Sequence, residues 1–111
     1  MRNKSKKLAE AEKNRFSIIQ KDMSICFFCG RPAQSIHELI GGMNRQTSIK
    51  HGLCVGACIR CHSILEDNPK IKLKYQILGQ NAFEEKYGHE LFMKEFKMNY
   101  REKGRLYELH C

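Results

Sequence analysis

Residues 26–62 read CFFCGRPAQSIHELIGGMNRQTSIKHGLCVGACIRCH, and the two Cys-x-x-Cys pairs in this stretch decide the fold. Two residues between a pair of cysteines let both thiolates face one ion, and two such pairs supply the four ligands that tetrahedral zinc prefers. Gly30 follows the first pair, at a place where a left-handed turn favours glycine. We therefore predict a structural zinc site made by Cys26, Cys29, Cys58 and Cys61.

Two other uses of these cysteines, disulfide bonding and simple burial, fit the sequence less well. The N-terminus, MRNKSKKLAEAEK, is charged and lacks the apolar stretch of a signal peptide. We therefore expect a cytoplasmic protein in a reducing compartment, where thiols bind metal instead of forming disulfides. No apolar run approaches the ~20 residues that span a bilayer, so we expect no membrane partner.

The chain has 111 residues, the size of one domain, and at this size a bound metal would usefully support a small hydrophobic core. Its 20 Lys and Arg against 12 Asp and Glu give a net charge of +8, and the basic excess lies mostly outside the cysteine stretch. This distribution suits contacts with nucleic-acid phosphates, although an ordinary solvated basic surface has the same composition. The candidate phosphate-binding residues are Lys4, Lys6, Lys7, Arg45, Lys50, Lys70, Lys72 and Lys74.

The sequence pattern divides the chain into three regions. Residues 1–24 form a basic N-terminal arm, in which good helix formers predict a helix over 4–20. Residues 25–67 form the cysteine module, and residues 68–111 form a helical support for it. The predicted fold class is therefore small α+β, with a zinc-stapled core and flanking N- and C-terminal helices.

The cysteine module predicts a hairpin followed by a helix. Residues 35–40 (SIHELI) and 52–57 (GLCVGA) are β-compatible, with the polar run over 43–51 as a long loop between them. Cys54 on the second strand is expected to be a buried apolar residue. His62 should lie in the first turn of the helix that follows the second cysteine pair.

The support region predicts two more helices. Asn68 can cap the first of these, which Pro69 would begin and Gly88 would end. Leu91, Phe92 and Phe96 mark a further short helix, and their helical spacing assigns these apolar residues to the core.

His37, Glu38 and His62 are the side chains within the zinc frame best suited to bind a second metal or to move a proton. A hairpin followed by a helix, drawn together by zinc, would place His37 on the first strand opposite His62 at the start of the helix. A structural histidine at either position is the alternative.

At these residues the chain resembles the His-Asn-His (HNH) nuclease superfamily, in the small forms whose Cys-x-x-Cys pairs flank the active hairpin. The pieces that carry the resemblance are CFFC, HEL and ACIRCH, and it covers about residues 24–100. The runs HELIGGMNRQTSIKHGL, LGQNAFEEKYG and FKMNY also resemble short HNH-like proteins of bacteriophages and prophages. The resemblance implies a treble-clef-like ββα-metal core.

The resemblance also implies cleavage of DNA phosphodiester bonds, with a catalytic Mg²⁺ or another divalent ion held by His37 and His62. It places Glu38 where the family has its general base. The reverse assignment, with His37 as the base and Glu38 as a metal ligand, is left open by the sequence.

One part of the family pattern is missing. Its central asparagine, which orients the base, should fall near Leu53, where this chain has no asparagine. Asn44 or His51 would have to take that role. Two alternatives to an endonuclease therefore stand: a zinc module that binds nucleic acid without cleaving it, and a protein-interaction module that uses zinc as a staple.

Overall fold

A two-stranded antiparallel sheet organises the N-terminal half of the computed structural model, which describes residues 15–110 and their side chains as far as residue 106. Strand β1 (Ser35–Glu38) pairs with β2 (Cys54–Ala57), so that His37 lies opposite Val55 and Glu38 opposite Cys54. This confirms the predicted hairpin, although β1 ends two residues earlier than the apolar pattern suggested.

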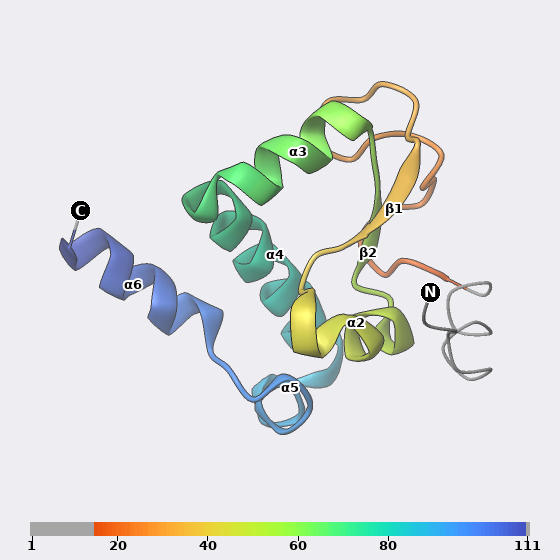
Figure 1. Ribbon diagram of the computed structural model, residues 1–111. Helices are drawn as coiled ribbons and strands as arrows, with labels where there is room; N and C mark the ends of the chain where they lie inside the picture. Colours follow the sequence, from red (N-terminus) through yellow and green to blue (C-terminus); the bar gives the residue numbers. More distant parts are fainter. Residues whose placement is uncertain (1–14, 111) are drawn as a thin grey trace, which may run out of the picture.

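The connection between the strands is helical, so the prediction of a loop over 43–51 is wrong. A 3-10 turn, η1 (Gly42–Asn44), leads directly into helix α2 (Arg45–His51), shown in yellow-green in Figure 1. The polar sequence conceals one buried face, where Ile49 is 2% exposed and the Ser48 hydroxyl donates to the Ile40 carbonyl at 2.5 Å. Packing of that face against the hairpin stabilises the helical conformation of this segment. Gly52, in the left-handed region at φ 76°, ends it.

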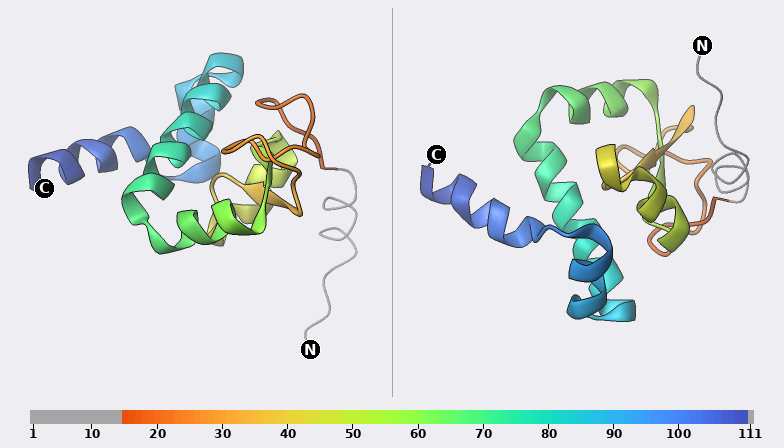
Figure 2. Two further views of the ribbon diagram at one scale, coloured as in Figure 1. Left: turned by 90° about the horizontal axis from the view of Figure 1, so that it is seen from above. Right: turned by 60° about the horizontal axis from the view of Figure 1, so that its bottom comes forward.

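Four helices follow the hairpin. They are α3 (Ile59–Asp67), α4 (Pro69–Tyr87), α5 (His89–Phe96) and α6 (Tyr100–His110). The predicted break at Asn68 and Pro69 and the predicted end at Gly88 are both confirmed. Helix α4 runs past the hairpin, α5 lies at its C-terminal end, and the far end of α6 projects away from the remainder of the fold in all three views (Figures 1 and 2).

The core lies where the hairpin meets α4 and α5. Its fully buried aromatic side chains are Phe83, Phe92 and Phe96, and the last two stack with ring centroids 4.6 Å apart. Full burial of one such side chain stabilises a fold by about 1.5–3 kcal/mol. The backbone of α4 approaches the hairpin closely, because a methyl group on Gly79 would lie 3.3 Å from Leu39. The core therefore fixes the hairpin against the helical support.

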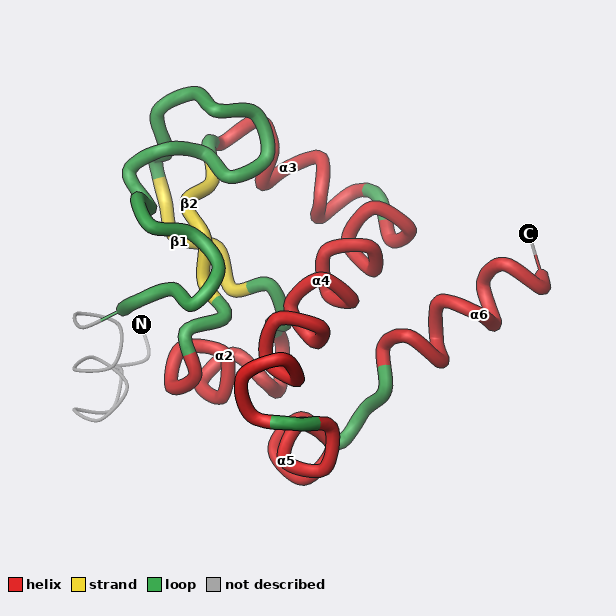
Figure 3. The backbone as a smooth tube through the Cα atoms, turned by 180° about the vertical axis from the view of Figure 1, so that it is seen from behind, coloured by secondary structure: helices red, strands yellow, loops and turns green. Residues whose placement is uncertain are grey.

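The segment that precedes the first cysteine pair runs alongside β2 and does not form a helix (Figure 3). The Ile18 amide donates to the Gly52 carbonyl at 2.9 Å, and the Gly56 amide donates to the Gln20 side chain at 2.8 Å. Because these polar groups bond to Gly52 and to β2, residues 15–20 are not helical, and the predicted helix is wrong there. Its remaining part lies outside the described residues, as do Lys4, Lys6 and Lys7.

Candidate metal centre and histidine pair

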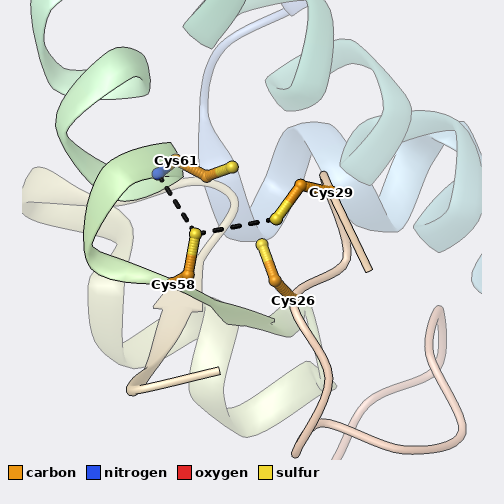
Figure 4. Close-up of side chains that lie close together, drawn as sticks. All are labelled: Cys26, Cys29, Cys58 and Cys61. Atoms are coloured by element: carbon orange, nitrogen blue, oxygen red, sulfur yellow. Dashed lines mark hydrogen bonds between the residues drawn. The ribbon is translucent and has the colours of Figure 1, made fainter. Parts of the chain in front are cut away.

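The four predicted zinc ligands converge. Cys26 and Cys29 come from a tight turn before the hairpin, Cys58 follows β2, and Cys61 lies in the first turn of α3. Figure 4 shows their sulfur atoms pointing toward one another, and the four lie within 4.8 Å of each other. In the part of the chain that the structure describes, this is the one group of three or more metal-binding side chains.

The geometry of the cysteine cluster fits a tetrahedral metal. Ligands at the usual Zn–S distance of 2.3 Å would place neighbouring sulfurs about 3.8 Å apart. The Cys29 and Cys58 sulfurs are 3.7 Å apart. Gly30 adopts φ 80° and donates its amide to the Cys26 carbonyl at 2.9 Å, which closes the first turn as the sequence predicted. The four cysteines could therefore hold a metal ion, and the set is compatible with structural zinc.

Backbone amides around the cysteine cluster favour thiolates. Burial raises the pKa of the Cys26 thiol, but hydrogen bonds from backbone amides, of which that of Cys58 is the strongest, bring it to about 6. Burial and the neighbouring thiols raise the pKa of Cys61 to about 12. Four thiolates packed together thus repel one another, and a bound cation would relieve that repulsion.

Cys54, which lies on β2, is fully buried, and burial raises the pKa of its thiol to about 12. This agrees with its prediction as an apolar residue outside the metal site. Cys54 is therefore a buried cysteine of β2 that takes no part in the cluster.

His37 and His62 face each other beside the cysteine cluster. Their ring centroids are 5.2 Å apart, and the rings meet edge to face. His37 is 7% exposed and contacts Phe28 on its other side, whereas the His62 side chain is 45% exposed. The Nε2 atom of His62 lies 3.9 Å from a carboxylate oxygen of Glu66, one turn further along α3. The pair thus offers imidazole nitrogens and a nearby carboxylate at an accessible surface.

His37 is held neutral by its surroundings. Burial lowers its pKa most, and electrostatic repulsion from the neighbouring His62 lowers it further, against smaller opposing effects of Glu38 and Glu66. We expect His37 in the zinc-loaded protein to titrate below 6.5, its ordinary value. NMR titration of the imidazole nitrogens would measure this, and His62→Gln should raise the pKa of His37 by removing that repulsion. A midpoint at or above 6.5 would contradict the burial of His37 between Phe28 and His62.

The same pKa shift affects stability in a defined direction. Because the folded state binds this proton less readily than the unfolded chain, the contribution of His37 to stability is present above about pH 6.5 and falls as the pH drops below it.

Glu38 is separated from the histidine pair. Adjacent residues of a strand point to opposite faces, and its carboxylate accepts from Arg15 at 3.1 Å and from Arg45 at 2.7 Å. Its side chain is 11% exposed. The carboxylate thus joins the segment before the hairpin and α2 to β1, on the face away from His62.

The two candidates for the missing asparagine are engaged elsewhere. The Asn44 side chain donates to the Phe96 carbonyl at 3.2 Å, and His51 Nε2 lies 3.0 Å from a carboxylate oxygen of Glu95. These contacts attach η1 and α2, respectively, to α5. Among the described residues, neither side chain has a contact with His37, so the suggestion that one of them orients a base at that position gains no support.

The described candidate phosphate-binding residues have mixed surroundings. Arg45 pairs with Glu38, and Lys50 lies 3.7 Å from Glu95.

The lysines of α4 lie closer to the histidine pair. Lys72 lies 4.0 Å from Glu66, and its positive charge contributes to the lowered pKa of His37. Lys70 is exposed, and Lys74 lies over the Tyr75 ring at 5.6 Å from its centroid. Lys70, Lys72 and Lys74 lie in the first two turns of α4, next to the helix that carries His62.

Sequence reasoning missed Phe28 and Arg15. Phe28 sits between the first cysteine pair and shields one side of His37, and its ring meets Tyr75 at a centroid distance of 4.7 Å. Arg15 lies 23 residues before its partner Glu38. No periodicity or spacing links these residues, so only the three-dimensional arrangement reveals them.

The chain matches no family model, no curated protein and no solved structure. None of the helices in the described part of the chain has the length and apolarity of a transmembrane span.

Proposed function

We propose that this protein is a metal-dependent endonuclease of the HNH type, which hydrolyses phosphodiester bonds in DNA. The observation that carries the proposal is the pairing of His37 on β1 with His62 at the start of α3, beside four cysteines suited to structural zinc. A hairpin followed by a helix with this ligand set is what a treble-clef-like ββα-metal core requires. The net charge of +8 suits a polyanionic substrate.

In this proposal His37 and His62 bind the catalytic ion. The lowered pKa of His37 keeps its imidazole neutral near pH 7, which is the form that binds metal. Glu66 adds a carboxylate next to His62, and Lys72 adds a positive charge near His37. When bound, a divalent ion neutralises charge on a scissile phosphate and lowers the pKa of bound water.

Glu38 has a positioning role in this proposal. Both of its carboxylate oxygens accept from guanidinium groups, on the face of β1 that points away from His62. It therefore fixes the strand that carries His37, in preference to acting as the base that the resemblance implies.

We expect Glu38→Gln to cleave DNA within about tenfold of the wild-type rate but to unfold more readily. Glutamine retains the shape and one acceptor oxygen, whereas two partly buried guanidiniums lose their charged partner, a loss of about 1–3 kcal/mol. A pH–rate profile together with thermal unfolding measures both effects. If cleavage is lost while DNA binding is retained, Glu38 is a base or a ligand, and the affinity of the variant for Mn²⁺ separates those two.

A plasmid nicking assay tests the proposal. Zinc-loaded protein should convert supercoiled DNA to nicked or linear DNA on addition of Mg²⁺, Mn²⁺ or Ni²⁺, and not without an added ion. Imidazole ligands suit Ni²⁺ better than Mg²⁺, so Ni²⁺ should give a faster rate than Mg²⁺. Binding of DNA without cleavage under any of these ions would instead identify a nucleic-acid-binding module that lacks the chemistry.

A further inference from the structure

A cleft of about 420 Å³ opens beside the cysteine cluster, between the first cysteine turn and the start of α3. It lies apart from the face that carries the histidine pair, since neither His37 nor His62 lines it. Its lining residues are Arg31, Pro32, Gln34, Cys58, Ile59 and Arg60.

The cleft is positively charged. Arg31 and Arg60 are both exposed, and no acidic residue lines the cleft. Every other arginine between residues 15 and 106 pairs with a glutamate: Arg15 and Arg45 with Glu38, Arg101 with Glu84, and Arg105 with Glu102. Within that same span, neither arginine of the cleft has an acidic partner. Two uncompensated guanidiniums at one hollow are suited to an anion.

The cleft is built on fixed backbone. The Cys26 amide donates to the Arg31 carbonyl at 2.6 Å, and the Gln34 side chain accepts from the Ile59 amide at 2.9 Å. The cysteine cluster ties both walls together through Cys58. Ile59 is 69% exposed and, with Pro32, gives the cleft an apolar side. The hollow therefore combines anion-binding groups with a surface for an apolar or sugar moiety.

We propose that this cleft binds a backbone phosphate of the nucleic-acid strand, with the adjoining sugar against Pro32 and Ile59. The inference rests on the proposed function and adds a second anchoring point to it. Arginine presents a planar fork that binds phosphate through two hydrogen bonds. Arg60 and His62 are two positions apart in α3, which places them on roughly opposite sides of its first turn. A strand that crosses the start of α3 is thus anchored at the cleft on one side and cut at the histidine pair on the other.

The test compares Arg31→Gln/Arg60→Gln with a control of equal charge change, Lys103→Gln/Arg105→Gln on exposed positions of α6. Binding of a fluorescein-labelled 20-base-pair DNA is measured by anisotropy at several KCl concentrations, without an added catalytic ion, and zinc content is measured alongside. The cleft variant should bind duplexes of unrelated sequence about tenfold or more weakly, and its slope of log K against log salt should fall by about 1–2. The control should match the wild type, and zinc content should be unchanged.

Several outcomes would overturn the inference. An unchanged affinity and salt slope, or an equal loss in the control, would show that the cleft is not a specific anchor. Loss of zinc from the cleft variant would assign the arginines to neutralising the metal–thiolate centre. Equally strong binding of poly-glutamate, lost in the same variant, would assign the cleft to an acidic polypeptide. Binding is measured without cleavage, so the two proposals can fail separately. If the cleft variant binds DNA more weakly but the wild type never nicks DNA, the cleft inference stands and only the nuclease proposal is wrong.

Discussion

Cys58→Ser is expected to unfold the protein. Structural zinc contributes about 10–16 kcal/mol in small zinc modules, whereas a domain of this size is stable by only about 5–15 kcal/mol in total. Cys58 also accepts from the Cys61 amide and lies 3.7 Å from Cys29, so its loss disrupts both halves of the cluster. Purified wild type should carry one zinc per chain by elemental analysis, and the variant should show neither zinc nor a cooperative thermal transition.

Cys54→Ala is the matched control for that experiment. Cys54 lies four residues earlier in the chain, is fully buried and takes no part in the cluster. Its truncation should lower the unfolding temperature modestly, as for other small deletions in a core, while zinc is retained. A folded wild type that contains no metal, or a Cys58→Ser protein as stable as the Cys54→Ala protein, would refute the zinc assignment.

His62→Ala is expected to abolish cleavage while the fold persists. If His62 is one of two imidazole ligands, as proposed, its removal should reduce the rate by about 10³-fold or more, which corresponds to about 4 kcal/mol of barrier. His62 is the better residue to change because its side chain is 45% exposed, whereas truncating the buried His37 also leaves a cavity. The rate of plasmid nicking is measured at saturating Mn²⁺, with zinc content and circular dichroism as checks on folding.

His89→Ala provides the comparison for the histidine experiment. His89 begins α5 and pairs with Glu84 at 2.7 Å, and it has no part in the histidine pair. It should cleave DNA at nearly the wild-type rate. Wild-type cleavage should also decline as the pH falls through the histidine range, because protonated imidazole does not bind metal. If His62→Ala cleaves as fast as His89→Ala, the ion is bound elsewhere and the proposed site is wrong.

The cysteine cluster could be predicted from sequence because its information is local. Two residues between cysteines determine how each pair presents its thiolates, whatever the remainder of the fold does. The position of His62 in the first turn of α3 follows from the same stretch. The hairpin and the boundaries at Pro69 and Gly88 were predictable for a similar reason, since each depends on the backbone preferences of neighbouring residues.

The features that sequence reasoning missed depend on contacts between distant residues. Helix α2 looks polar, and only the burial of Ile49 against the hairpin explains why it is a helix. The segment around Ile18 favours a helix locally, but its amide bonds to Gly52 across the fold. The engagement of Glu38 by Arg15 and Arg45 could not be read from spacing either. Tertiary contacts override local propensity at each of these places.

The close approach at Gly56 gives the two-stranded sheet a covered edge. A methyl group on Gly56 would lie 2.2 Å from the Met23 carbonyl oxygen, and its own carbonyl accepts from the Phe27 amide at 2.9 Å. With Gln20 occupying the Gly56 amide, the outer side of β2 bonds to its own chain. An exposed strand edge is a template for pairing with other molecules and hence for aggregation. Phe27, in the turn between Cys26 and Cys29, is one of the residues that cover this edge and so prevent pairing with other molecules. Loss of a metal bound by that turn would therefore both destabilise the fold and expose a strand edge that promotes aggregation.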